Sequence, residues 1–234
     1  MNTVLVGEIA CGLVMVSGQR GLELDPGQRA RVAAQHSKAC AWLESLEPRA
    51  RLRFRTEHQH VVVGATGGDE DAPGRRGREA PAAPEDVWVV PALRALGHDG
   101  HDDYLDALRA STGCTQAFAI YVGKFRMAHF AYARDDRICL SWFCGGLGVQ
   151  NMHALLVHET CHLFGAADEA DGCRCPEKSG HLQVENGNCT HCNAHPQPCI
   201  MAGNSLDLCP WTRRQIGWDD AVFDACSAAT KPGI

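Results

Sequence analysis

Two histidines separated by one helical turn stand in the stretch "HETCHLFGAADE" at residues 158–169. Side chains four residues apart on an α-helix lie on one face, so His158 and His162 can direct ring nitrogens at the same ion. Glu159 is about 100° round the helix from His158, beside the ion rather than bonded to it. The spacing predicts a catalytic zinc centre in which Glu159 takes a proton from a zinc-bound water.

The same pattern also occurs by chance in long helices. Here it falls within an apolar segment, "ALLVHETCHLFG". Burying two histidines and a glutamate in such a helix without a partner would be costly. The apolar setting therefore favours a metal centre over a chance match.

The residues after His162 limit where a third ligand can lie. Gly165 can adopt the left-handed backbone that ends a helix, and Asp168 follows where the chain turns back toward the ion. A carboxylate oxygen is an ordinary zinc ligand, so we expect His158, His162 and Asp168 to hold the metal. Other side chains could reach the ion through a long loop; these alternatives are His181, His191, His195 and Cys173.

Strands and helices along the chain must place this helix against a core, and 234 residues suffice to build one. Asp25 and Pro26 are a good N-cap and a good first residue for an early helix. Periodicity and turn residues predict strands at 3–16, 50–64, 115–125, 127–134 and 137–143, and helices at 24–48, after Pro91, at 101–112, up to Gly165 and at 211–218. A loop is expected at 64–85.

This order of elements predicts an α+β fold. We expect a twisted mixed sheet with helices and a zinc-binding helix, followed by an irregular, Cys-rich C-terminal subdomain. The predicted division is an N-terminal subdomain at 1–165 and a C-terminal subdomain at 166–234, because the regular apolar pattern stops after Gly165.

The extended motif resembles the metzincin clan of zinc metallopeptidases, whose pattern is H-E-x-x-H-x-x-G-x-x-H followed by a methionine-containing turn. His158, Glu159, His162 and Gly165 match position by position, whereas Asp168 stands in place of the third histidine. That difference resembles the snapalysin-type zincins. The wider string, with "CIM" and "CPWTRRQIGW" after it, is similar to a group of bacterial proteins with H-E-x-x-H-x-x-G-A-P-D-E, over roughly 158–218.

The resemblance implies further roles. Met201, in "PCIMAGN", corresponds to the methionine of the Met-turn, which packs beneath the zinc-binding histidines. A substrate peptide would lie extended along an edge strand of the sheet, and "MAHFAYAR" and "RICLSWF" are the candidate strands. No tyrosine follows Met201 by two residues, since Gly203 stands there.

Thirteen cysteines form an unusually large set, and six of them fall within a short segment: Cys173, Cys175, Cys189, Cys192, Cys199 and Cys209. The spacings C-x-C and C-x-x-C suit a second, structural zinc, but six cysteines also allow fifteen disulfide pairings. The cysteine two residues before the methionine in "CIM" also resembles the archaemetzincins, which carry a second, cysteine-bound zinc. The sequence leaves zinc and disulfides open.

The composition narrows the partners. The net charge is −6 without a basic tail, so we expect no nucleic-acid partner. The early apolar stretch "VLVGEIACGLVMV" is too short to span a bilayer, and no Lys or Arg precedes it as in a signal peptide. We expect no membrane partner, a monomer, and a cytoplasmic location by default, with a missing leader or non-classical export as alternatives.

Taken with the resemblance, these residues predict a zinc metalloendopeptidase that hydrolyses peptide bonds in a peptide or protein substrate. The alternative from another class is a catalytically silent, zinc-stabilised binding module with the same fold. A redox or metal-storage protein is a weaker third reading, because no C-x-x-C stands at a strand-to-helix junction.

Overall fold

The computed structural model describes residues 4–64, 86–125, 127, 129–170, 172–203 and 205–229. The chain divides into two compact units. Unit 1 comprises residues 1–8, 39–53 and 154–234, and unit 2 comprises residues 9–38 and 54–153. Residues 154–165 thus belong to the same unit as the C-terminal segment, while the boundary expected at residue 165 stays a prediction. The loop expected at 64–85 lies, apart from its first residue, outside the described residues.

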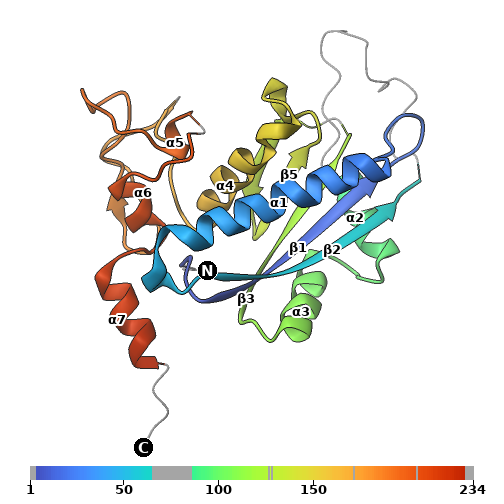
Figure 1. Ribbon diagram of the computed structural model, residues 1–234, viewed down its shortest axis with the longest axis horizontal. Helices are drawn as coiled ribbons and strands as arrows, with labels where there is room; N and C mark the ends of the chain where they lie inside the picture. The colour runs from blue at the N-terminus through green and yellow to red at the C-terminus, as the bar shows by residue number, and fades with distance from the viewer. Residues whose placement is uncertain are drawn as a thin grey trace, which may run out of the picture. The chain divides into compact units, whose positions relative to one another are not determined.

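A five-stranded sheet forms the centre of unit 2 (Figure 1). Its strands are β1 (Glu8–Ser17), β2 (Arg53–Val62), β3 (Gln116–Gly123), β4 (Ala131–Arg134) and β5 (Arg137–Ser141). Their order is β2-β1-β3-β5-β4. β1 pairs with β3 and β3 with β5 in parallel, whereas β4 pairs with β5 antiparallel. The sheet is therefore mixed, and the prediction of an α+β fold is confirmed at this level.

The order of strands separates the two strands that were candidates for pairing with an extended peptide. β5 lies between β3 and β4, so both of its edges are hydrogen-bonded. β4 lies at the end of the sheet, and among the described residues only its edge toward β5 is hydrogen-bonded to another strand. Of the two candidates, only β4 could accept another strand.

Helices cover both faces of the sheet in unit 2 (Figure 1). On one face, α2 (Asp86–Ala95) and α3 (His101–Thr112) bury apolar side chains such as Trp88 and Leu105 against strand residues such as Val14 and Ala119. On the other face lies the beginning of α1 (Pro26–Leu46), where His36 contacts the Cys11 thiol at 3.2 Å. Burial on both faces explains why β1 and β3 are continuous apolar runs.

Local sequence signals set the ends of these helices, with one exception. Asp25 caps α1: its carboxylate accepts from the Gln28 amide at 2.8 Å, and the Gln28 side chain accepts from the Asp25 amide at 3.0 Å. The prediction that a helix starts after Pro91 is wrong, because α2 begins at Asp86 and contains Pro91. Burial of Trp88 and Val89 in the core outweighs the hydrogen bond that the proline removes.

Short elements make up most of unit 1. They are α4 (Met152–Leu163), which begins in unit 2, β6 (Lys178–Ser179), β7 (Val184–Glu185), α5 (Ile200–Gly203), α6 (Pro210–Gln215) and α7 (Asp220–Ala229). Three 3-10 turns complete the described chain, η1 (Pro48–Ala50), η2 (Cys144–Gly146) and η3 (Val149–Asn151). β6 and β7 form a two-stranded antiparallel hairpin in the Cys-rich segment. α7 was not predicted from the sequence.

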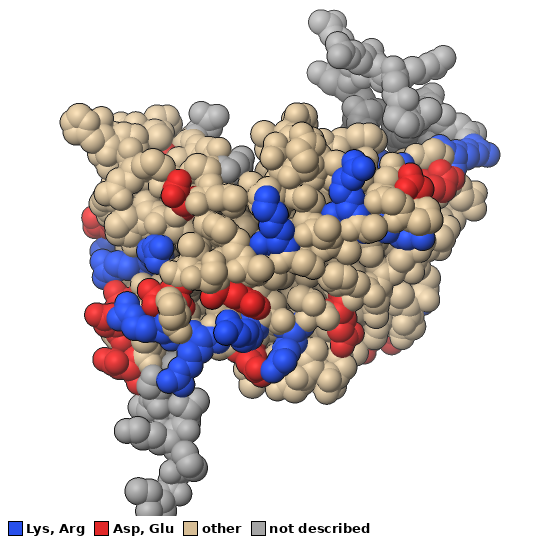
Figure 2. All heavy atoms as spheres, viewed as in Figure 1, with Lys and Arg blue, Asp and Glu red and all other residues tan. Residues whose placement is uncertain are grey.

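Charges of both signs are interspersed on the face of the molecule that Figure 2 shows. Arg49 pairs with Asp220, and Arg214 pairs with Asp219 at 3.0 Å, both within unit 1. Within the described part of the chain, none of the helices combines the length and the apolar character that crossing a membrane requires.

Candidate metal centre

The two histidines of α4 face each other as the helical spacing predicts. The rings of His158 and His162 pack edge to face with centroids 4.7 Å apart, and their Nε2 atoms are 3.0 Å apart. The helix itself is apolar and mostly buried, which fixes the direction in which both rings point. The side chains remain 16% and 23% exposed, so an ion between them could be reached from solvent.

Backbone carbonyls determine which ring nitrogen carries the proton. The Nδ1 atom of His158 is 2.9 Å from the carbonyl oxygen of Ile200, and Nδ1 of His162 is 2.8 Å from that of Ala166. A carbonyl can only accept, so each neutral ring must place its N–H on Nδ1. Both Nε2 atoms then carry a lone pair. This arrangement is the usual way in which proteins orient metal-binding histidines.

Asp168 completes a set of three acceptors. Its Oδ1 atom lies 3.3 Å from Nε2 of His158 and 3.4 Å from Nε2 of His162. With both histidine protons on Nδ1, three lone-pair atoms converge without a hydrogen between them. A positive charge relieves their repulsion, either a metal ion or a second proton on a ring; against the effect of burial, Asp168 raises the pKa of His162. Two imidazoles and a carboxylate are a zinc ligand set that leaves a fourth position for water or substrate. The residues present therefore fit the metal that the sequence predicts.

The chain after α4 brings Asp168 to this position. Gly165 has a φ of 96°, and the Ala166 amide donates to the Cys161 carbonyl at 2.9 Å, which ends the helix in a Schellman-like turn. Side chains then hold the backbone of the loop: Gln215 accepts from the amide of Ala167 at 3.1 Å, and Asn186 donates to the carbonyl of Asp168 at 2.7 Å. The predicted role of Gly165 as a helix stop is confirmed.

Charge interactions in this cluster lower the pKa of Asp168. The main cause is hydrogen bonding from His158 and His162 in their protonated form, in which Nε2 also carries a hydrogen, and it outweighs the partial burial of the carboxylate. Asp168 is therefore ionised at neutral pH, as a metal ligand must be.

Glu159 lies beside the acceptors but is not one of them. It is only 6% exposed, and burial raises the pKa of its carboxyl group, with His158 and His162 opposing that shift. Its carboxylate forms no hydrogen bond to any other residue that the structure describes. The group is therefore free to accept a proton from a water molecule at the metal position.

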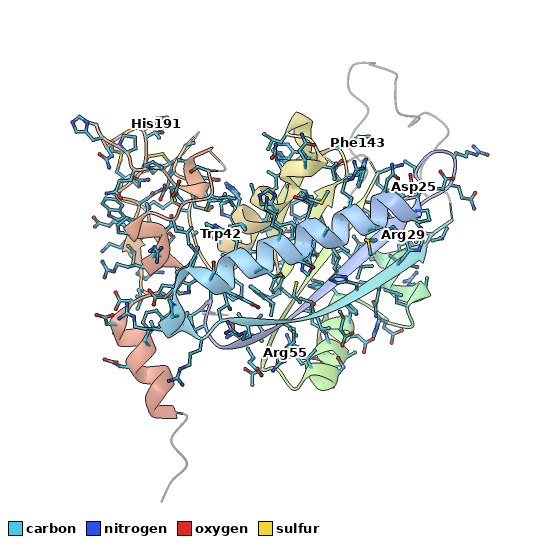
Figure 3. All side chains as sticks on the ribbon, in the orientation of Figure 1. Asp25, Arg29, Trp42, Arg55, Phe143 and His191 are labelled. Atoms are coloured by element: carbon cyan, nitrogen blue, oxygen red, sulfur yellow. A yellow bond between two sulfur atoms is a disulfide. The ribbon has the colours of Figure 1, made fainter. Side chains whose placement is uncertain are left out.

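The alternative third ligands do not join this group. Within the described ranges, only Asp168 has a ligand atom within 4.8 Å of both histidine nitrogens. His191 instead lies near Cys173 and Cys189 and projects outward from the Cys-rich segment, as Figure 3 shows. The role of Asp168 as a ligand stays a prediction, but none of the alternative ligands is grouped with His158 and His162 in the described part of the chain.

Met201 lies in α5, directly after the carbonyl that orients His158. Its side chain is 1% exposed, and its own carbonyl accepts from the Glu169 amide at 3.0 Å. The turn that contains Met201 thus supports one ligand through Ile200 and the third-ligand loop through Glu169. The predicted Met-turn is compatible with this placement and remains a prediction.

The six clustered cysteines separate into two groups. The structure pairs Cys173 with Cys189 and Cys175 with Cys192 as disulfides. These bonds cross-link the segment around the β6–β7 hairpin, where the sequence allowed either zinc or disulfides. The sulfurs of Cys175, Cys189 and Cys192 also lie within 4.8 Å of one another, close enough to hold a metal ion, so a cysteine-bound metal remains the alternative for this segment. Cys199 and Cys209 do not take part and are buried free thiols.

A buried polar cluster that the sequence did not predict surrounds those two thiols. Glu169, Cys199 and Cys209 have ligand atoms within 4.8 Å of one another, and Thr212 lies among them. The members are 30 and 10 residues apart along the chain, so no local spacing could have revealed them. The one signal in the sequence is the glutamate that directly follows Asp168 in "ADEA".

No known family profile matches the chain, and no curated protein does. Among solved structures, the chain is similar to the crystal structure of a zinc-dependent peptidase from Methanocorpusculum labreanum (strain Z). The sequence identity is 12%, the TM-score is 0.34, and the match covers 88% of this chain and 100% of that one.

Proposed function

We propose that this chain is a zinc-dependent metallopeptidase that cleaves peptide bonds inside a peptide or protein substrate. The observation that supports it most directly is the convergence of three acceptor atoms, from His158, His162 and Asp168, within 3.4 Å of one another. Beside them stands the carboxylate of Glu159, which forms no hydrogen bond to another of the described residues. This is the set of groups that metal-assisted hydrolysis requires.

The reaction follows from the roles of these groups. Bound zinc would polarise the substrate carbonyl and make an attacking water more acidic. Glu159 takes a proton from that water while the water oxygen forms a bond to the carbonyl carbon of the substrate. When the carbon–nitrogen bond breaks, Glu159 returns the proton to the leaving amine. Because burial raises the pKa of Glu159, the carboxyl group holds that proton more readily than an exposed glutamate would.

We further propose membership of the metzincin clan, with Asp168 as the third ligand and Met201 in the Met-turn. The backbone contacts of residues 200 and 201 to His158 and Glu169 support this assignment. A carboxylate ligand leaves the metal centre one positive charge lower than a third histidine would, which weakens its pull on the substrate carbonyl.

The rival function is a catalytically silent binding module that uses the same metal for stability. Glu159 argues against it, because a purely structural zinc site has no use for a buried carboxylate that forms no hydrogen bond within the described part of the chain. A mixed peptide library separates the two. A peptidase cleaves internal bonds, loses activity with a chelator and regains it with zinc, whereas a binding module cleaves nothing under any of these conditions.

A further inference from the structure

A buried asparagine in the Cys-rich segment bridges the two stretches of chain that orient the candidate ligands. Asn188 is completely buried. Its Nδ2 atom donates to Oε2 of Glu169 at 2.6 Å, and Glu169 directly follows Asp168 in the chain. The same Nδ2 atom donates to the carbonyl of Gln197 at 3.0 Å, and the Oδ1 atom accepts from the Gln197 amide at 2.8 Å. One side chain thus contacts both stretches.

The stretch at 197–201 contains the carbonyl of Ile200, which orients His158. At the end of this stretch, the Met201 carbonyl accepts from the amide of Glu169 at 3.0 Å. A single hydrogen bond lets two segments pivot about it, whereas a second attachment several residues away fixes their relative direction. The bridge made by the asparagine, at the beginning of the stretch, is this second attachment.

The chemistry of an asparagine amide matches its surroundings at this position. Its two N–H groups face a carboxylate and a carbonyl, and its oxygen faces an N–H. A buried polar group that loses its partner is costly, because water does not replace the bond. The backbone reinforces the contact, since the amide of Thr190 donates to the carbonyl of Glu169 at 2.9 Å. Removal of the Asn188 amide would therefore release the side chain of Glu169 and the Gln197 end of the stretch together.

We infer that Asn188 is a positioning residue of the zinc centre, which fixes Asp168 relative to His158 without being a ligand. The inference rests on the proposed function, which assigns those two residues as ligands. Residues that orient the ligands of a metal from behind change its affinity by about 10–100-fold when they are removed. The asparagine should therefore act on zinc binding first, and on peptide cleavage through it.

Zinc affinity of the full-length Asn188→Ala chain, measured by competition with a chromogenic chelator, tests the inference. The site is identified by its loss in His158→Ala/His162→Ala. The matched control is Asn193→Ala, because the Asn193 side chain donates to the Gly187 carbonyl at 3.1 Å and accepts from the His195 amide at 2.9 Å, within the same Cys-rich segment.

We expect the zinc dissociation constant to rise about 10–100-fold in Asn188→Ala and to keep the wild-type value in Asn193→Ala. Asn188→Asp keeps the shape of the side chain but removes both donated hydrogen bonds, so it should weaken zinc binding as well. A folded Asn188→Ala protein that is less stable in urea without zinc, yet binds zinc like the wild type, would overturn the inference. The asparagine would then serve stability alone.

Hydrogen exchange on the wild type provides a measurement that no folding defect can obscure. If the Asn188 bonds tighten zinc binding, bound zinc protects those bonds by the same factor. The amide of Gln197 should therefore exchange more slowly with zinc than without it, while the amide of His195, bonded to Asn193, should not change. Equal exchange of the Gln197 amide in both states would overturn the inference. A protein that meets these expectations but cleaves no peptide supports the role of Asn188 and contradicts the proposed peptidase alone.

Discussion

The Nε2 atoms of His158 and His162 lie 3.0 Å apart, and each ring has its other nitrogen committed to a backbone carbonyl. Two lone pairs therefore face each other, with the carboxylate of Asp168 as a third. A positive charge at the centre, either a metal ion or a second proton on one ring, removes the repulsion between these lone pairs.

Asp168→Ala should remove the zinc. Without the carboxylate, two histidines remain, and zinc sites in enzymes need three protein ligands. We expect the zinc content measured by mass spectrometry to fall by one per chain, and hydrolysis to be lost with it. His181→Ala and His195→Ala, at two alternative ligands, are the controls and should retain full zinc. Full zinc in a folded Asp168→Ala protein would contradict the assignment.

Gly165→Ala should destabilise the protein more than an alanine at an ordinary left-handed position. A Cβ at Gly165 would lie 2.5 Å from the Gly180 Cα, in addition to the cost of a φ of 96°. Gly172 has a φ of 84°, but an added Cβ would have nothing within 4 Å. Gly172→Ala therefore measures the cost of the left-handed backbone without a steric clash. We expect a loss of about 1 kcal/mol at Gly172 and about 2 kcal/mol or more at Gly165 in urea unfolding. Equal losses would exclude the close approach to Gly180.

The two disulfides should be detectable without reduction. Alkylation of the unfolded protein in the absence of reductant should leave Cys173, Cys175, Cys189 and Cys192 unmodified, while Cys199 and Cys209 react. Peptide mapping should then find 173 linked to 189 and 175 linked to 192. Modification of all four in freshly purified protein would show that the segment is not cross-linked.

His101 should make stability depend on pH. Its Nε2–H donates to the Asp135 carbonyl at 3.1 Å, so its Nδ1 accepts from the Tyr121 hydroxyl at 2.9 Å. Burial, with Arg137 nearby, lowers the pKa of His101 below its usual 6.5. The unfolded chain therefore binds the proton more readily, and stability is full above pH 6.5 and falls as the pH drops toward the folded pKa.

Urea unfolding with and without His101→Gln checks this sign, in chelator so that metal binding does not contribute. Between pH 7.5 and 5, the wild type should lose more stability than the variant, which cannot titrate at this position. Other histidines with lowered pKa values, such as His58, His60 and His153, are present in both proteins. Their contributions to the pH dependence cancel when the two profiles are subtracted. Parallel pH profiles would contradict the role of His101.

The part of the site on α4 and in the short connection after it could be predicted from the sequence, because helical spacing alone determines how these residues lie. His158, Glu159 and His162 share one helix, and Gly165 brings Asp168 back over a short connection. The hydrogen bonds of His158 and His162 to the carbonyls of Ile200 and Ala166 could not be predicted, since every residue has a backbone carbonyl and a sequence motif does not show which ones meet the rings. The same holds for Glu169 with Cys199 and Cys209, which only the folded turn brings together.

The periodicity of the sequence predicted the strands and the long helices, but the start of α2 and the pairing of the cysteines depend on tertiary contacts. α2 continues through Pro91 because the burial of Trp88 and Val89 outweighs a local rule. The pairing of the cysteines around β6 and β7 also depends on which chain segments meet, and spacing left fifteen arrangements.

Glu159→Gln, compared with the wild type at equal zinc content, separates proton transfer by Glu159 from metal binding. Glutamine keeps the size of the side chain but cannot take up a proton, so zinc binding should be unchanged. We predict that cleavage of an internal peptide bond falls about 10²–10⁴-fold, the usual contribution of a general base. A fully metallated Glu159→Gln protein that cleaves the same peptides at the wild-type rate would show that Glu159 is not the general base of a zinc-dependent peptidase.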